Sequence, residues 1–230
     1  MSSISLMGAF ALQMAPAIAQ PMGPWLDEAM PMNVEEPVRK IGVCPKTYLA
    51  GGVQLQPAPE LYWIWQPDQA WGRPEMIEVL TRAAEEMAWL MPEADPIVVG
   101  DISTRYGGFL EGHKSHRAGV DADIGLYWGE GRMHLGGFRD VHPKNLDLEA
   151  NWLLIRSLLE TGLVERILLD QRLIRVLKRY TIESGELTVE EAERVFPIGY
   201  NRMWTHPAVV HHAPSHKEHM HVRTFCWAGT

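Results

Sequence analysis

The sequence predicts an α+β domain, with a mainly antiparallel sheet at its core and flanking helices. Apolar residues recur at three- and four-residue spacing in some segments, as in amphipathic helices, and alternate or run together in others, as in strands. The two kinds of segment are mixed without the regular alternation of a parallel sheet. Of the 230 residues, 46% are hydrophobic and 22% charged, so a single domain can bury a full core.

The N-terminal segment differs from the rest of the chain. Residues 4–19 are mostly apolar, carry no charge and end in Ala17-Ile18-Ala19, the small-x-small pattern of a cleavage site. We therefore expect residues 1–19 to be a secretory signal peptide; the alternative is a disordered apolar tail. Prolines among acidic and methionine residues predict an irregular lead-in at residues 20–40. The folded domain should then span residues 41–230.

The first half of this domain contains strands around one long helix. Residues 53–65 alternate loosely and are rich in aromatic residues, which predicts a strand region. Pro74 can occupy the first turn of an amphipathic helix that ends near Pro92. Residues 96–100 form a short apolar run, and residues 120–128 alternate. Both predict strands, with a glycine- and histidine-rich loop between them.

The second half begins with a helix that Asp147 can cap. A strand is predicted at residues 166–169, and Asp170 can cap the helix that follows it. Thr188 begins a Thr-x-x-Glu sequence, the form of a capping box, so a short helix should start there. The last predicted strand covers residues 219–225.

The charge and hydropathy of the chain exclude two classes of function. Its formal net charge is −8, and it has no cluster of Lys and Arg that could neutralise a phosphate backbone, so we expect no nucleic-acid partner. No apolar run reaches the roughly 20 residues that a membrane-spanning helix needs. We therefore expect no membrane span.

Only two cysteines are present, Cys44 and Cys226. Two isolated cysteines cannot form a zinc knuckle or a redox CxxC motif. In an exported protein they could close a disulfide that spans most of the chain, and otherwise they would be two buried free thiols. The count alone leaves both alternatives open.

Two clusters hold the residues with catalytic chemistry. The first lies within residues 112–123 and the second within residues 216–221; their ionisable members are His113, His116, Asp121 and Asp123, and His216, His219 and His221. Catalytic zinc takes three imidazole or carboxylate ligands and leaves one position to water. A single His-x-His on a strand is more often a surface feature, but the two clusters together predict a zinc site.

Strand geometry predicts how the histidines of the second cluster are placed relative to each other. Residues i and i+2 of a strand point to the same face about 7 Å apart, so His219 and His221 should lie side by side. If His221 binds the metal, His219 lies where it can take a proton from the attacking water. The same period places Asp121 beside Asp123. In a helix both pairs would diverge, so the chemistry requires two extended segments.

Other readings of these residues remain open. Asp121 and Asp123 could be turn residues, and His113 and His216 could be solvated loop histidines. The remaining histidines, which have no partner at recognisable spacing, are interpreted as loop residues: His134, His142, His211 and His212. The aromatic residues around Trp63 are either core or groove wall.

The pattern His-x6-Asp followed far downstream by His-x-His resembles the LAS group of zinc peptidases. His116 to Asp123 and His219-Met220-His221 fit this pattern. The longer strings GDISTRYGG, GHKSHRAGVDADI and HKEHMHVRTFC resemble one branch of the group, the penicillin-insensitive murein endopeptidases. A weaker resemblance extends from about residue 41 to residue 227.

The resemblance implies a LAS-type peptidase fold and a role for each matching residue. It implies that His116, Asp123 and His221 bind Zn²⁺ and that His219 is the catalytic base. It implies that His113 and His216 are further active-site histidines. Of the family's disulfides, only a bridge between Cys44 and Cys226 could be shared by this chain, so we expect that pairing.

The resemblance also implies a substrate and a location. We expect hydrolysis of the peptide cross-links of peptidoglycan, at the amide between D-alanine and meso-diaminopimelate, in the periplasm. No serine would be acylated, so penicillin should not inhibit. Two alternatives remain, which are a zinc carboxypeptidase that acts on stem peptides and a non-hydrolytic zinc-containing module that binds peptidoglycan.

Overall fold

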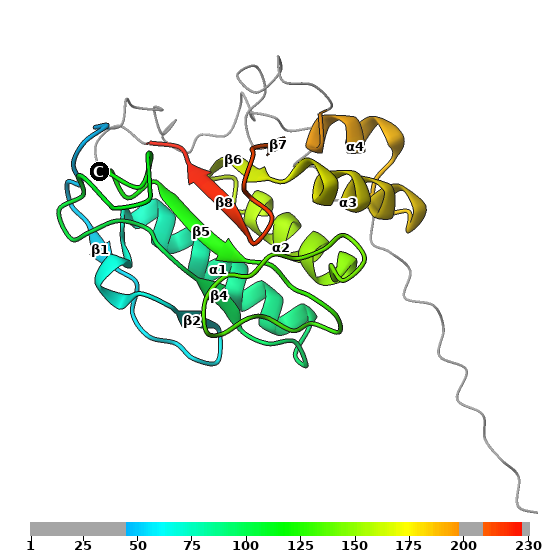
Figure 1. Cartoon of the computed structure of the whole chain (residues 1–230), viewed down its shortest axis with the longest axis horizontal. Helices are drawn as coiled ribbons and strands as arrows, with labels where there is room; N and C mark the ends of the chain where they lie inside the picture. The colour runs from blue at the N-terminus through cyan, green and yellow to red at the C-terminus, as the bar shows by residue number, and fades with distance from the viewer. Residues whose placement is uncertain (1–44, 198–208, 227–230) are drawn as a thin grey trace, which may run out of the picture.

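A six-stranded sheet forms the centre of the fold, with the strand order β2-β4-β5-β8-β6-β7 (Figure 1). The structure is a computed structural model that describes residues 45–197 and 209–226. The strands of this sheet are β2 (Tyr62–Ile64), β4 (Ile97–Val99), β5 (Asp121–Gly125), β8 (His219–Thr224), β6 (Val164–Leu169) and β7 (Val209–His212). A separate two-stranded ribbon pairs β1 (Val53–Gln54) with β3 (Trp71–Gly72).

The α+β prediction is confirmed, and the three central strand pairs are antiparallel: β4 with β5, β5 with β8, and β8 with β6. The two outer pairs differ, because β2 is parallel to β4 and β6 is parallel to β7. Each parallel pair needs a crossover connection. Helix α1 (Pro74–Leu90) lies in the first, and α3 (Gln171–Glu183) and α4 (Val189–Val195) lie in the second.

The predicted helix starts are confirmed in detail. Pro74 occupies the first turn of α1. The side chain of Asp147 accepts a hydrogen bond at the start of α2 (Leu148–Glu160), and that of Asp170 does so at the start of α3. At α4 both hydrogen bonds of the capping box that starts at Thr188 are present. These side chains satisfy backbone N–H groups that have no partner inside the helix.

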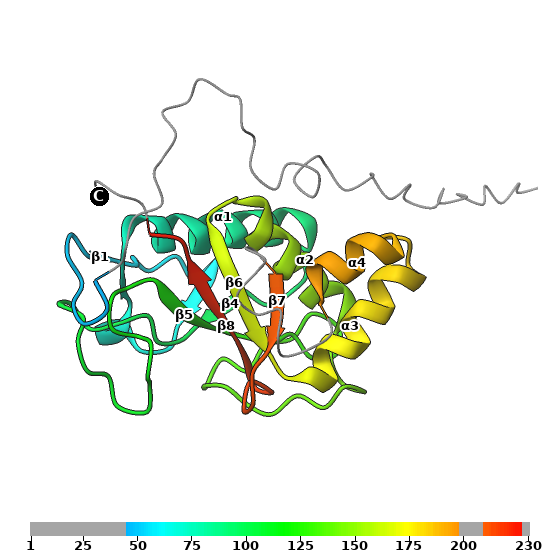
Figure 2. The same cartoon turned by 90° about the horizontal axis from the view of Figure 1, so that it is seen from above.

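The sheet has one helix-covered face and one face that holds the polar clusters. Helices α1 and α2 lie together against the first face (Figure 2). Along β5 and β8 the residues of that face are apolar and fully buried: Ala122, Ile124, Met220 and Val222. The alternate residues of both strands are ionisable or glycine and point to the other face.

Two short strands were missed by the sequence analysis, β3 and β7. His211 and His212, interpreted there as loop residues, belong to β7, and the Nδ1 atom of His212 accepts a hydrogen bond from the first backbone N–H of α3. The prediction was wrong because this short segment becomes a strand only by pairing with β6, a contact that its own residue pattern does not specify.

Several predictions fall outside the described residues. The proposed signal peptide at residues 1–19 and the lead-in at residues 20–40 are among them. Cys226 is buried beside Ala118 and Val120, but Cys44 is outside the described ranges, so the disulfide stays a prediction. None of the helices within residues 45–197 and 209–226 is long and apolar enough to cross a membrane.

Candidate metal centre

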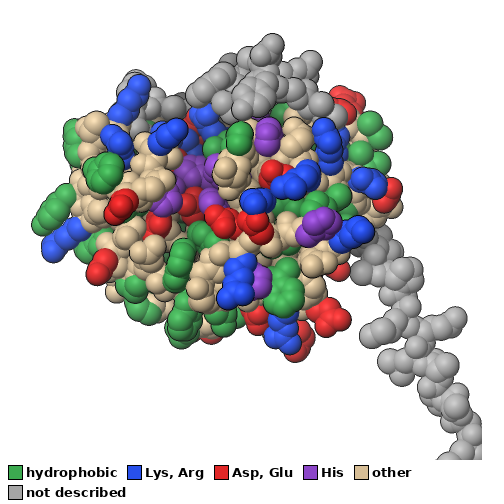
Figure 3. All heavy atoms as spheres, viewed as in Figure 1, with side chains coloured by type: hydrophobic (Ala, Val, Ile, Leu, Met, Phe, Trp, Pro, Cys, Tyr) green, Lys and Arg blue, Asp and Glu red, His purple; other side chains and the backbone are tan. Residues whose placement is uncertain are grey.

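The register of β5 and β8 places the two polar clusters opposite each other. Asp123 pairs with His221, Asp121 pairs with Arg223, and Gly125 pairs with His219. All three pairs are two residues apart along their strands, so they share the sheet face that the helices leave uncovered. On that face histidine side chains gather over β5 and β8, with acidic side chains beside them (Figure 3).

Three potential ligand atoms form a compact triangle on this face. The Nδ1 atom of His221 lies 2.9 Å from Oδ1 of Asp123 and 3.1 Å from Nε2 of His116. The third side, from Nε2 of His116 to Oδ1 of Asp123, measures 3.3 Å. All three side chains are buried, with at most 6% of the residue exposed. The triangle joins β5, β8 and the loop before β5.

In both imidazoles, the nitrogen that points away from the triangle makes a hydrogen bond that decides which nitrogen carries the proton. The Nδ1 atom of His116 lies 3.1 Å from the carbonyl oxygen of Ile102, which can only accept, so Nδ1 donates and Nε2 keeps its lone pair. The Nε2 atom of His221 likewise donates to Oδ1 of Asp121 at 2.9 Å. When both imidazoles are neutral, as metal binding requires, two nitrogen lone pairs and a carboxylate oxygen converge. A cation between them would relieve their mutual repulsion.

The dimensions of the triangle suit a tetrahedral zinc ion. Zinc bonds of about 2.0 to 2.2 Å place two tetrahedral ligands roughly 3.3 Å apart, and the three measured separations lie between 2.9 and 3.3 Å. A carboxylate behind an imidazole ligand, here Asp121 behind His221, is the usual outer contact of such a site. The donor set thus fits zinc.

His113 lies at the edge of the triangle. Its ligand atom and those of His116 and Asp123 lie within 4.8 Å of one another, so these three residues also form a possible metal-binding group. The His113 nitrogens, however, contact carboxylates: Nε2 lies 2.9 Å from Oδ2 of Asp101, and Nδ1 lies 3.6 Å from Oδ2 of Asp123. The hydrogen bond to Asp101 raises the pKa of His113. Both nitrogens of His113 thus face carboxylates, whereas Nδ1 of His221 lies within 3.1 Å of both other ligand atoms, so His221 completes the more compact group.

The two carboxylates also shape the electrostatics of the triangle. Burial lowers the pKa of His221, but hydrogen bonds to Asp121 and Asp123 outweigh it and raise this pKa to about 9. Burial raises the pKa of Asp123, but His116 and His221 outweigh it and hold this pKa well below its usual range. The centre therefore stabilises positive charge between these groups, whether a proton or a metal ion supplies it.

His219 and His216 complete the group beside the triangle. The Nε2 atom of His219 lies 3.6 Å from Oδ1 of Asp123, and burial lowers the pKa of His219 to about 4. The His216 ring lies 5.1 Å from that of His219, between ring centres. Its Nδ1 atom donates to the carbonyl of Pro214, and burial lowers its pKa. Both imidazoles are therefore neutral near pH 7.

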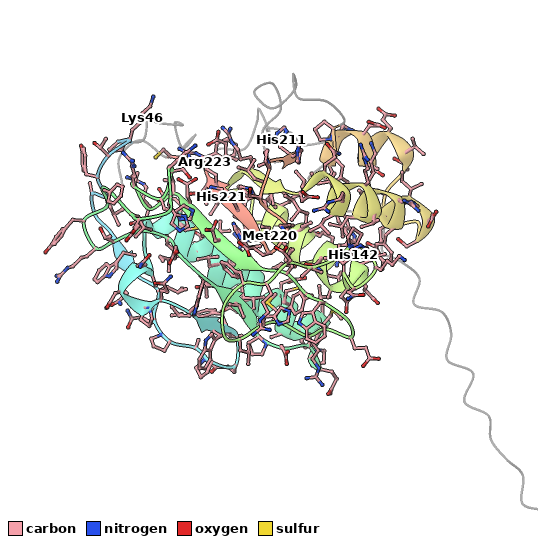
Figure 4. All side chains as sticks on the ribbon, in the orientation of Figure 1. Lys46, His142, His211, Met220, His221 and Arg223 are labelled. Atoms are coloured by element: carbon pink, nitrogen blue, oxygen red, sulfur yellow. The ribbon has the colours of Figure 1, made fainter. Side chains whose placement is uncertain are left out.

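The other histidines that the sequence analysis named lie outside the candidate centre. His134 stacks on Trp128, and His142 accepts a hydrogen bond from the backbone of Lys144. His211 lies two strands from His221 in the same row of the sheet, because Leu168 of β6 pairs with both, and His142 lies on another part of the molecule (Figure 4). Trp63 and Trp65 are exposed, and Trp65 contacts Phe138 beside His219, so neither ring lies in the buried core.

Two residues near the centre were missed from the sequence. Asp101 orients His113, and Phe138 packs on His219. A signal for Asp101 was present, because it is the second residue after the buried apolar strand β4, a common position for a functional carboxylate. Phe138 carries no such signal, because its loop is distant from His219 in the chain.

Several known proteins are similar to this chain. A penicillin-insensitive murein endopeptidase of Pectobacterium atrosepticum is 28% identical over 189 residues, which cover 76% of this chain and 60% of the relative. Relatives with the same name occur in Haemophilus influenzae, at 34% identity over 118 residues (49% of this chain, 40% of the relative), and in Klebsiella pneumoniae, at 25% over 215 residues (90% and 73%). The chain thus spans about 60% of the length of the Pectobacterium relative.

The match to the family as a whole covers residues 40–170, more than half of the chain. This segment includes β5 and the loop that supplies His113 and His116. The chain therefore belongs to the penicillin-insensitive murein endopeptidase family.

Proposed function

We propose that this protein is a zinc-dependent murein endopeptidase. One observation supports the metal chemistry above all others: His116 Nε2, His221 Nδ1 and Asp123 Oδ1 converge within 3.3 Å, with a neutral histidine beside them. The relatives' names support the substrate, which is murein. In this proposal His116, Asp123 and His221 hold Zn²⁺.

Zinc bound by these residues would lower the pKa of a water molecule toward about 7 and polarise the scissile carbonyl. His219 is the base in this proposal, because its imidazole is neutral near pH 7 and lies beside the ligand Asp123, where it can meet the attacking water. It then delivers that proton to the leaving amine. Asp123, 3.6 Å from Nε2 of His219, stabilises the imidazolium between the two steps.

The two further histidines differ in what they can offer a substrate. Both nitrogens of His113 face carboxylates, those of Asp101 and Asp123, so His113 is suited to orient the ligand Asp123. His216 uses Nδ1 for the carbonyl of Pro214, which leaves Nε2 as the nitrogen that can meet a substrate. We assign His216 the substrate contact and His113 the orienting role.

The proposed bond is the amide between D-alanine and meso-diaminopimelate in cross-linked peptidoglycan. Attack by water forms no acylated serine, so β-lactams have no nucleophile to trap. Penicillin at concentrations that block serine peptidases should leave the rate unchanged.

The deciding experiment is digestion of purified sacculi, with the released muropeptides resolved by mass spectrometry. The proposal expects cross-linked dimers to be converted to monomers, and His219→Ala serves as the matched inactive control. Release of terminal D-alanine from uncross-linked stems alone would instead identify a carboxypeptidase. Retention on sacculi without any release would identify a binding module.

We also propose that the protein is exported to the periplasm and that Cys44 and Cys226 form a disulfide there. The apolar segment at residues 4–19 and its Ala17-Ile18-Ala19 end support export. N-terminal sequencing of the mature protein tests the cleavage, and thiol titration of denatured, unreduced protein tests the disulfide. Two free thiols in periplasmic material would contradict the pairing.

A further inference from the structure

The imidazole of His219 differs from the other four imidazoles of the candidate centre, because no hydrogen bond within the described part of the chain orients it. A hydrogen bond orients each of the others, through Asp101 for His113, Ile102 for His116, Pro214 for His216, and Asp121 for His221. The Nδ1 atom of His219 is buried and has no hydrogen-bond partner among the described residues. The nearest carboxylate oxygen, Oε1 of Glu218, lies 3.8 Å away, beyond hydrogen-bond distance.

An aromatic ring takes the place of the missing hydrogen bond. The ring of Phe138 stacks on the His219 imidazole, with centres 5.0 Å apart and planes inclined by 28°. Trp65 meets Phe138 edge to face at 5.4 Å. Offset stacking restricts rotation of both rings, and apolar contact keeps water from the imidazole face.

Two glycines make room for the ring of Phe138. Gly100, directly after β4, lies under the ring, and a Cβ atom there would be 2.5 Å from Cζ of Phe138. Gly125, the cross-strand partner of His219, lies beside it, and a Cβ atom there would be 3.6 Å from Cε1. The close approach at Gly100 leaves no room for a larger residue. Phe138 is therefore held between the sheet and His219.

We infer that Phe138 is a positioning residue that holds the His219 imidazole in the orientation needed for proton transfer. This inference rests on the proposed role of His219 as base. Without the ring, the imidazole is free to turn its Nδ1 atom toward Glu218, and Nε2 then leaves its place beside Asp123. A base misplaced by about 1 Å can lose about 100-fold in rate, whereas the ligand triangle does not involve Phe138.

The test compares Phe138→Leu with Phe138→Tyr, using the full-length zinc-loaded protein and a cross-linked muropeptide dimer. We expect Phe138→Leu to lower kcat by about 10- to 100-fold with little change in KM or zinc content, and Phe138→Tyr, which keeps the ring, to stay within about threefold of the wild type. Trp89→Leu, an aromatic on the exposed side of α1, is the matched control and should keep full activity.

Gly100→Ala provides a second, independent variant. Its new methyl group should displace the Phe138 ring and lower kcat in the same way. The double variant Gly100→Ala/Phe138→Leu should then be no worse than Phe138→Leu alone, because both changes act through one ring. If Phe138→Leu does not fold, Gly100→Ala and Phe138→Met, which keeps the volume without a ring, decide the question.

Nuclear magnetic resonance of histidine-labelled protein gives a readout that needs no turnover. The ring protons of His219, assigned with His219→Ala, should be shifted by the stacked ring in the wild type and lose that shift in Phe138→Leu. Unchanged resonances in Phe138→Leu would overturn the inference, as would unchanged kcat or a loss of zinc in proportion to activity. A wild-type protein that cleaves no murein would overturn the proposed function instead, while the resonances would still report on the stacking.

Discussion

Asp123 and His221 lie directly opposite each other in the β5–β8 pair, and Oδ1 of Asp123 is 2.9 Å from Nδ1 of His221. The two residues are 98 positions apart in the chain, so the register of one strand pair creates the candidate centre. A slip of one residue would turn every side chain of a strand to the other face. The apolar residues on the helix-covered face, such as Ile124 and Met220, therefore secure the register on which the polar face depends.

Removal of the metal should abolish activity. All three proposed ligands are side chains, and in the proposed mechanism the metal activates the water, so treatment with a chelator should reduce muropeptide release to the background level. Addition of zinc should restore it. The measurement is the rate of dimer cleavage before chelation, after it, and after zinc is added. Full turnover in a sample shown by elemental analysis to be metal-free would contradict the mechanism.

Replacement of His221 and replacement of His219, which lie on the same strand, should affect zinc binding and activity differently. His221→Ala should lose both zinc and activity, because two remaining ligands hold zinc poorly. His219→Ala should keep most of its zinc and still lose about 10² to 10⁴ in rate, the usual contribution of a general base. Metal analysis paired with muropeptide release measures both. If His219→Ala were metal-free and His221→Ala loaded, the two roles would be reversed.

Asp121 should control zinc affinity without touching the metal. Its carboxylate accepts from Nε2 of His221 at 2.9 Å and from Arg223 at 2.9 and 3.1 Å. Loss of such an outer carboxylate typically weakens metal binding by about 10- to 100-fold, so Asp121→Asn should raise the zinc dissociation constant by that amount. Glu165→Gln is the control, because Glu165 contacts Arg223 and not Asp121. Equal affinity in both variants, measured by chelator competition, would argue against this role.

Asn151 should be important for stability, because its buried side chain joins the start of α2 to the segment after β5. Its Nδ2 donates to the carbonyls of Tyr127 and Asp147, and its Oδ1 accepts from the backbone N–H of Tyr127. Both carbonyls also accept from a backbone N–H, so Asn151→Ala leaves only the buried N–H of Tyr127 unpaired and should cost about 1 to 3 kcal/mol.

Urea denaturation of the Asn151 variant measures the free energy of unfolding. Ser157→Ala is a matched control on the same helix, because the buried Ser157 hydroxyl has no hydrogen-bond partner among the described residues. Its stability should be nearly that of the wild type. A similar loss of stability in both variants would mean that the lost side-chain volume, and not the lost hydrogen bonds, causes the destabilisation.

The capping box of α4 should make stability depend on pH in a defined direction. The Glu191 carboxylate accepts from the backbone N–H and the hydroxyl of Thr188, both at 2.7 Å, and the backbone hydrogen bond lowers its pKa most. A lowered pKa in the folded state adds stability above the usual Glu range, and that stability is lost as pH falls through the folded pKa. Glu191→Gln should therefore be less stable than the wild type at pH 7, with a gap that closes below about pH 4.

Thermal unfolding at a series of pH values measures this gap. The same substitution in a Thr188→Ala background provides the control, because one of the two hydrogen bonds is then absent. There the gap at pH 7 should be smaller. A gap that stays constant from pH 7 to acid would show that the charge of Glu191 does not contribute.

Much of the local structure could be predicted because its causes lie within a few residues. Asp147, Asp170 and Thr188 cap the helices that follow them, and each cap acts on backbone groups two or three residues away. The placement of His219 and His221 on one strand face follows from the period of two of an extended chain. These relations need no knowledge of where the rest of the chain lies.

Only the tertiary structure decided which segments meet. Residues distant in the chain meet in the β5–β8 pair and in the parallel outer strands. The same holds for the contact of Asp101 with His113 and for the stacking of Phe138 on His219. Such contacts form because the whole chain buries its apolar faces together, and many arrangements share the same local pattern. The sequence by itself determined the chemical groups and the face on which each strand presents them, while the packing of the core determined the few ångströms that separate them.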